Sequence, residues 1–95
     1  MLKVKYSITA EKTLIDISLF IDSVNTEGSG KRWKNRFHLK ILRYAQSNII
    51  YNSCRYEEYS KKGFSCISIG DWIVIFKIKN DNFLVQHIIL GSNFK

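Results

Sequence analysis

The sequence has no hydrophobic run that approaches the roughly 20 residues a helix needs to cross a bilayer. It contains no internal repeat, and its start alternates charged and apolar residues, unlike a signal peptide. These absences predict a cytoplasmic protein with no membrane partner. With 95 residues, 45% of them hydrophobic, the chain can build one core but not two, which predicts a single domain over residues 1–95.

Cysteine is scarce, with only Cys54 and Cys66 in the chain. One isolated pair is neither a disulfide framework nor a zinc site, so we expect two reduced thiols in or near a strand. The sequence also lacks paired His and Cys spacing and has no Gly-rich loop that enters a helix after a strand. We therefore expect no metal, no cofactor and no small-molecule substrate.

Acidic residues are few, with eight Asp and Glu against fifteen Lys and Arg, which gives a net charge of +7. Such a chain should attract polyanions or an acidic partner. Many small basic proteins nevertheless bind no nucleic acid. Charge alone therefore leaves a functional basic surface and a merely solvated one equally open.

Three apolar, β-branched runs follow one another between Phe64 and Gly91, namely FSCISI, WIVIFKIK and FLVQHIIL. Gly70-Asp71 and Asn80-Asp81-Asn82 separate them, and these residue types tolerate the tight backbone of hairpin turns. The pattern predicts three strands in an antiparallel meander.

Alternation along these runs assigns their side chains to two faces. In the middle run, the set that should face the helices is Trp72, Val74, Phe76 and Ile78. The outer set is an amphipathic strip that a peptide from another chain could cover, comprising Ile73, Ile75, Lys77 and Lys79. In the last run we expect one shared face for Phe83, Val85, His87 and Ile89. Neither face of that run is fully polar, which indicates a central or partner-covered strand.

The first half of the chain predicts a strand followed by a helix. Residues 2–8 alternate between apolar and polar, and Ser7 or Thr9 can supply the hydroxyl that caps a helix ending near Val24. Ile15 and Leu19 lie four residues apart and away from the core stripe of this helix. They require a second contact, from a neighbouring helix or from a partner protein.

A second helix is predicted after the glycine-containing turn at residues 25–30. Its core face is formed by Trp33, Phe37, Ile41 and Tyr44. Its basic flank is a candidate contact surface or simply a solvated flank, and comprises Arg32, Arg36, Lys40 and Arg43.

Residues 46–62 are expected to form a connecting loop with a possible helical turn. This loop carries three further basic candidates for binding a partner or nucleic acid, namely Arg55, Lys61 and Lys62.

This order of strand, helical hairpin, connecting loop and meander resembles the RelE/ParE family of toxins from type II toxin-antitoxin (plasmid stabilisation) systems. The resemblance covers nearly the whole chain. Residues 6–10 (YSITA) are similar to the family's first strand end and helix, and residues 70–78 (GDWIVIFKI) to its strand G-(polar)-aromatic-R-V-I-Y-x-I. The resemblance implies an α+β fold, in which an N-terminal strand and a two-helix hairpin pack on one face of an antiparallel sheet completed by a C-terminal three-stranded meander. It also implies a cognate antitoxin as partner.

The resemblance further implies one of two mechanisms. RelE-type toxins are ribosome-dependent messenger-RNA endonucleases that use strand lysines and arginines. Here Ile73 stands where the family commonly has Arg, Ser65 and Ile67 replace basic positions, and Leu90-Gly91-Ser92-Asn93 stands where His or Arg often occurs. With no catalytic set identified, we expect ParE-like action by binding a target, with DNA gyrase as a candidate.

Two alternatives stay open. The first is a divergent messenger-RNA endonuclease acting at the ribosome, with its phosphate-holding groups at Lys61, Lys62, Lys77 and Lys79. The second is an inactive family member or a plain interaction module.

A lone histidine needs an oriented partner to transfer protons. His38, expected on the outer side of its helix, and His87 are therefore predicted to be structural or solvent-facing.

Overall fold

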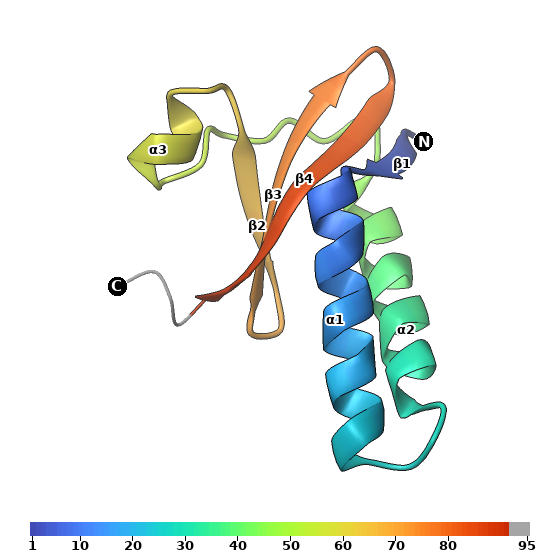
Figure 1. Cartoon of the computed structure of the whole chain (residues 1–95). Coiled ribbons are helices and arrows are strands. Elements are labelled where there is room, and N and C mark those ends of the chain that lie inside the picture. The colour runs from blue at the N-terminus through green and yellow to red at the C-terminus, as the bar shows by residue number, and fades with distance from the viewer. Residues whose placement is uncertain (92–95) are drawn as a thin grey trace.

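The computed structural model describes residues 1–91 and has an α+β architecture. The sequence predicted the elements in the order in which they occur (Figure 1). They are β1 (Lys3–Tyr6), α1 (Ile8–Val24), α2 (Ser29–Tyr44), α3 (Glu57–Ser60), β2 (Ser65–Ile69), β3 (Trp72–Lys79) and β4 (Asn82–Leu90). The short α3 is the helical turn considered possible in the connecting loop.

The four strands form one sheet in the order β1-β4-β3-β2. The meander β2-β3-β4 is antiparallel as predicted, with left-handed backbone at Gly70, Asn80 and Asp81 in its two turns. The expected wholly antiparallel sheet is wrong, because β1 pairs parallel to β4. Alternation in a sequence assigns faces but not partners or directions. The position of β4 between β1 and β3 confirms that it is a central strand.

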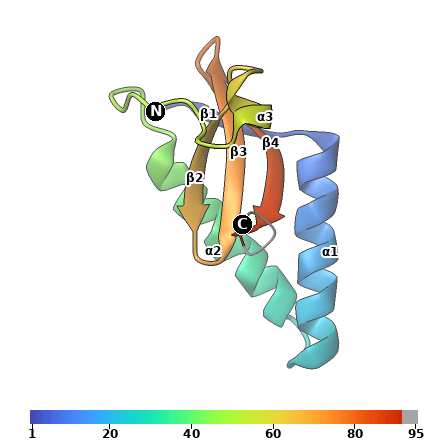
Figure 2. The same ribbon diagram turned by 90° about the vertical axis from the view of Figure 1, so that its left-hand side faces the viewer.

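The helical hairpin covers one face of this sheet, and α3 lies on the other side (Figures 1 and 2). The predicted core residues of α2, Phe37 and Ile41, are buried there against Val74 and Phe76 of β3. The rings of Phe76 and Phe83 stack with their centroids 4.2 Å apart. Each such buried side chain contributes about 1.5–3 kcal/mol of hydrophobic stabilisation, so the sheet–hairpin interface supplies the main core.

A β-bulge interrupts the pairing of β3 with β4. Ile75 pairs with His87 but Phe76 pairs with Val85, which leaves Gln86 as the extra residue of β4. Because a bulge reverses the alternation beyond it, Ile88 joins the helix-side core. The prediction that Phe83, Val85, His87 and Ile89 share a face is therefore wrong. The first two face the helices, and the last two share the opposite face with Ile75 and Ile73, their partners in β3.

Ser7 connects this bulge to the start of α1. Its backbone N–H donates to the Val85 carbonyl at 2.8 Å, and its hydroxyl donates to the Gln86 carbonyl at 2.6 Å. The same hydroxyl oxygen accepts the Ala10 N–H at 2.9 Å, which caps the helix. One side chain therefore fixes where β1 ends, where α1 begins and how both meet β4.

The chain itself covers part of the outer face of the sheet. Residues 52–64, which connect α2 to β2 in the chain, cross this face and are here called the cover segment (Figure 2). Ile73 and Ile75 are only 6% and 0% exposed, so the prediction that they form an open strip for a foreign peptide is wrong. Alternation along β3 shows which side chains share a face, but it does not show that the preceding loop folds across that face.

A disulfide fastens the cover segment to β2. Cys54 is bonded to Cys66, whose partner across the strands is Ile75, and the two Cα atoms are 4.8 Å apart. The Cys54 N–H also donates to the Phe64 carbonyl at 2.9 Å. The expected pair of reduced thiols is therefore wrong, because sequence spacing did not reveal that this loop folds back beside β2.

The two long helices approach each other closely where Gly30 meets Ser18. A Cβ atom added to Gly30 would lie 1.9 Å from the Ser18 carbonyl oxygen, so no larger residue fits without moving a helix. We expect Gly30→Ala to lower the free energy of unfolding by about 1–3 kcal/mol in urea titrations. Lys31→Ala, at an exposed neighbouring position, should change it by less than about 0.5 kcal/mol. Equal stability of the two variants would contradict this packing.

Candidate functional site

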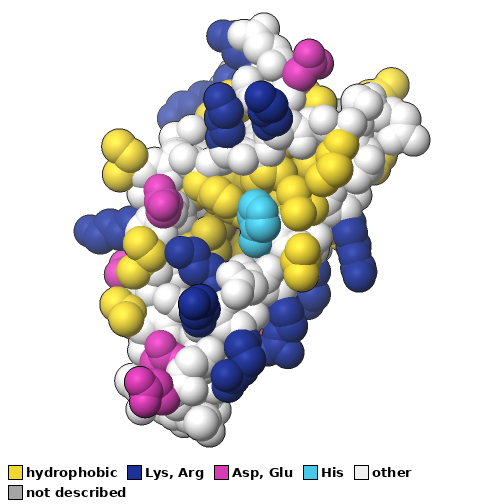
Figure 3. Space-filling view, turned by 90° about the vertical axis from the view of Figure 1, so that its right-hand side faces the viewer, with side chains coloured by type: hydrophobic (Ala, Val, Ile, Leu, Met, Phe, Trp, Pro, Cys, Tyr) yellow, Lys and Arg dark blue, Asp and Glu magenta, His cyan; other side chains and the backbone are white. Residues whose placement is uncertain are grey.

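A groove of about 410 Å³ lies between α1 and α2. Figure 3 shows the hairpin side of the molecule, where hydrophobic side chains gather around a histidine and Lys and Arg stand near the margin. The groove is lined by Tyr6, Glu11, Leu14, Lys34, Asn35, His38 and Leu39. Its floor is apolar and its rim carries both positive and negative groups, which is the composition of a site for an amphipathic partner.

Tyr6 and His38 form a hydrogen-bonded pair in this groove, with 2.6 Å between the Tyr6 hydroxyl and His38 Nδ1. Burial raises the pKa of Tyr6 to about 12, so its hydroxyl keeps its proton at neutral pH. A hydroxyl can donate to a neutral Nδ1 and accept from a protonated one, so either state of the ring has a partner. His38 was predicted to be structural or solvent-facing, and as a half-buried residue hydrogen-bonded to Tyr6 it is structural.

An apolar surface flanks the groove and is here called the hairpin patch. It comprises Ile8, Ile15 and Leu19 of α1 and Leu39 of α2, all exposed. Successive helical residues advance by about 100°, so the three α1 residues lie within about 40° of one another. Leu19 and Leu39 are 61% and 59% exposed. No element within residues 1–91 buries Ile15 and Leu19, so the neighbouring-helix explanation for them is wrong.

The predicted basic flank of α2 borders this patch. Arg32, Arg36 and Arg43 are exposed and lie within about 60° of Leu39 around the helix axis. Lys40 is exposed but lies about 100° from Leu39, nearer the sheet side. The arginines therefore place positive charge directly beside exposed apolar surface, an arrangement that suits an acidic amphipathic segment.

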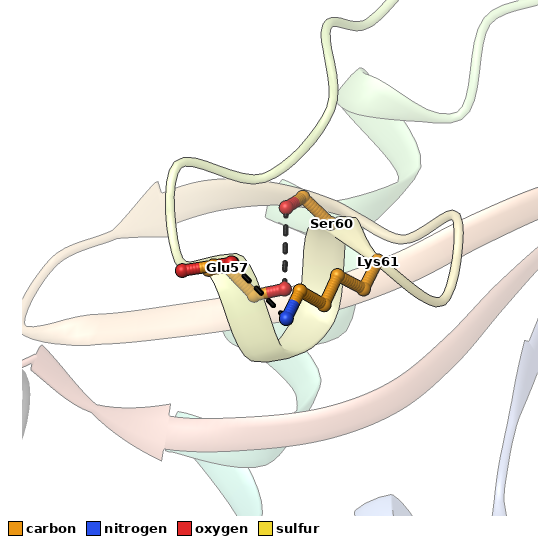
Figure 4. Close-up of polar contacts among 3 residues, drawn as sticks. All are labelled: Glu57, Ser60 and Lys61. Atoms are coloured by element: carbon orange, nitrogen blue, oxygen red, sulfur yellow. Dashed lines mark hydrogen bonds and ion pairs between the residues drawn. The ribbon is translucent and has the colours of Figure 1, made fainter.

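The remaining predicted basic residues belong to a different surface. Arg55 stacks on the Tyr56 ring, with 5.0 Å from its Cζ to the ring centroid. In α3, Lys61 pairs with Glu57 at 3.1 Å and the Ser60 hydroxyl donates to the Glu57 carbonyl (Figure 4). Lys62 is exposed. These residues lie in the cover segment, across the sheet from the helical hairpin, so the predicted site residues form no single site.

The outer face also holds Lys77 and Lys79, which the sequence predicted there. The Lys77 ammonium lies 4.6 Å from the centroid of the Phe64 ring. His87 contacts the ring of Tyr59, with their centroids 5.8 Å apart. Burial, together with the Glu58 charge, raises the pKa of Tyr59. These contacts pack the cover segment onto the sheet and present no nucleophile paired with a base.

The part of the chain the structure describes contains no group of three or more His, Cys, Asp or Glu side chains that could hold a metal ion. No helix in that part is long and apolar enough to cross a membrane. Ser92 and Asn93, which stand where the resembled family often has His or Arg, lie outside the described residues. No protein-family model and no curated protein matches this chain.

The disulfide is the feature whose removal tests the closed outer face. Cys54 and Cys66 are separated by 12 residues, and closing a loop of that size stabilises a fold by about 2–3 kcal/mol. We expect Cys54→Ser with Cys66→Ser to lower the free energy of unfolding by that amount and to speed hydrogen exchange in β2. A thiol reductant should reproduce the loss in the wild-type chain and leave the double variant unchanged. An unchanged stability in reductant would contradict the role given to this bond.

Proposed function

We propose that this chain is the ParE-like toxin of a type II toxin-antitoxin system and acts in the cytoplasm by binding its target. DNA gyrase is the target to test first. The antitoxin that neutralises it would lay an acidic, amphipathic segment over the hairpin patch. The observation that carries the proposal is the uncovered apolar surface around the groove, bordered by Arg32, Arg36 and Arg43.

The hairpin patch combines three exposed apolar residues on one side of α1 with Leu39, which lines the groove. Single exposed apolar residues are ordinary on proteins, whereas several on one side of the molecule beside a groove favour an interaction surface. An amphipathic helix placed in such a groove buries apolar anchors spaced three or four residues apart. Ile15 and Leu19 have that spacing on α1, and Leu39 faces the groove from α2. The neighbouring arginines would steer an acidic partner and fix its direction.

The closed outer face also favours the hairpin as the antitoxin site. Ile73 and Ile75, which could have received a peptide, are only 6% and 0% exposed. Access to Ile75 would require release of the cover segment, because Cys54 is bonded to Cys66, the partner of Ile75 across the strands. The hairpin patch requires no rearrangement, so a partner can bind it at a lower cost in free energy.

Binding rather than catalysis is favoured by the residue at position 73. The resembled ribonucleases commonly place an arginine there, whose charge would stabilise a phosphate. Here the position holds a buried isoleucine. The endonuclease alternative then depends on Lys61, Lys62, Lys77 and Lys79, and Lys61 is already paired with Glu57.

The test is to induce the protein alone in a bacterium and to follow growth, DNA supercoiling and messenger integrity. We expect growth arrest with altered supercoiling and intact messenger. Co-expression of a neighbouring open reading frame that encodes a small protein with an acidic or amphipathic tail should restore growth. Harmless expression of the folded protein would contradict a toxin, and rapid cleavage of messenger would support the endonuclease instead.

Variants then locate the antitoxin site. Leu19→Asp with Leu39→Asp places two charges in the hairpin patch and should abolish the rescue while leaving toxicity intact. Phe20→Asp is the matched control, because Phe20 is 65% exposed but lies about 100° beyond Leu19, outside the patch. Rescue of both variants alike would contradict binding at the patch.

A further inference from the structure

Four lysines from two strands that are distant in sequence meet on the outer face at one end of the sheet. Lys3 of β1 and Lys79 of β3 both lie opposite Asn82 of β4, one on each side. Lys5 and Lys77 flank Leu84 in the same way. Residues paired across neighbouring strands share a face, so the four form a lysine quartet around the start of β4.

The spacing of the lysine quartet follows from sheet geometry. Adjacent strands are about 4.8 Å apart, which puts β1 and β3 about 10 Å apart across β4. Residues two apart along a strand are separated by about 7 Å. The Lys3 N–H donates to the Asp81 carbonyl at 3.0 Å, which fixes the end of β1 against the β3–β4 turn. The backbone positions of the four lysines are thereby held on a rigid scaffold within a small area.

Edge protection explains only part of this cluster. Lysines on an exposed edge strand discourage pairing with other sheets, and this accounts for Lys3 and Lys5 of β1. Lys77 and Lys79 lie beyond Phe76, the last residue of β3 that pairs with β2, so edge protection applies to this end of β3 as well. It does not explain why the two lysine pairs converge around the same end of β4. A hollow of about 400 Å³ at this end is lined by Met1, Lys3, Lys5, Asn80, Asp81 and Asn82, with Asp81 as the one acidic residue of that lining.

We propose that the lysine quartet binds the phosphate backbone of duplex DNA without regard to sequence. Duplex DNA carries one charge per about 1.7 Å of its axis, so closely spaced lysines can each meet a phosphate. Binding of single strands instead relies on exposed aromatic rings on which bases stack. The neighbouring aromatic, Phe64, is half-buried and has Lys77 over its ring. Backbone contact with a duplex is therefore the mode that this surface offers.

This surface is separate from the hairpin patch. The lysine quartet lies on the outer face of the sheet, whereas the helical hairpin covers the opposite face (Figure 1). The two surfaces can be occupied together, and the inference does not rest on the proposed toxin function. It holds or fails whether or not the chain is toxic.

The test is a salt titration of the purified wild-type protein against a fluorescent DNA duplex of arbitrary sequence. Each phosphate contact contributes about −0.9 to the slope of log affinity against log salt, so four contacts predict about −3.6. A fourfold rise in salt should then weaken binding about 150-fold. Lys5→Ala with Lys77→Ala should reduce the slope to about −1.8. Because Lys77 also contacts Phe64, Lys3→Ala with Lys79→Ala provides a second pair that leaves this contact in place.

Two controls separate the lysine quartet from net charge. Arg32→Ala with Arg36→Ala removes the same charge from the helical hairpin and should leave the slope near that of the wild-type protein. Asp81→Asn suits the left-handed turn and removes the carboxylate from the hollow, so it should tighten binding several-fold. No duplex binding, equal losses in the arginine and lysine variants, or tighter binding of the matching single strand would each overturn the proposal.

Discussion

The hydrogen bond from the Ser7 hydroxyl to the Gln86 carbonyl is the contact on which the arrangement of the other elements depends. It holds the bulge of β4 against the end of β1 and leaves the same oxygen free to cap α1. The bulge turns His87 and Ile89 to the outer face and brings Ile88 into the helix-side core. The Ser7 contact at the bulge therefore influences both the direction in which the helical hairpin begins and the burial of β4 on two faces.

Burial of the central strands on both faces determines where binding surfaces remain. The helical hairpin covers one face, and the cover segment covers the other through Cys54, Tyr59 and Phe64. Two of the surfaces that stay open are the far side of the hairpin and the end of the sheet beyond the cover segment. The first is apolar with an arginine border, and the second carries lysines and amides. These chemistries suit different partners.

Local patterns in the sequence predicted the elements, because a helical or strand period records which face is buried. They also predicted β4 as a central or partner-covered strand and identified Ile15 and Leu19 as apolar residues away from the core stripe of α1. They could not show the bulge, since the run from Phe83 to Leu90 alternates without a glycine or proline to mark it. The parallel pairing of β1, the Cys54–Cys66 bond and the Tyr6–His38 pair depend on contacts between distant parts of the chain. Helical spacing and strand alternation predicted the basic residues of α2 and β3, but only the structure shows that they lie on opposite sides of the sheet.

The central claim is that the outer face is closed and the hairpin patch is open to a partner. Photochemical carbene labelling of the free protein, followed by mass spectrometry, measures the exposure of each side chain directly. We expect heavy labelling of Leu19 and Leu39 and protection of Ile73 and Ile75. In a complex with the proposed antitoxin, labelling of Leu19 and Leu39 should fall while that of Phe20 persists. Labelling of Ile73 and Ile75 in the free protein, or unchanged labelling of the patch in the complex, would contradict the account.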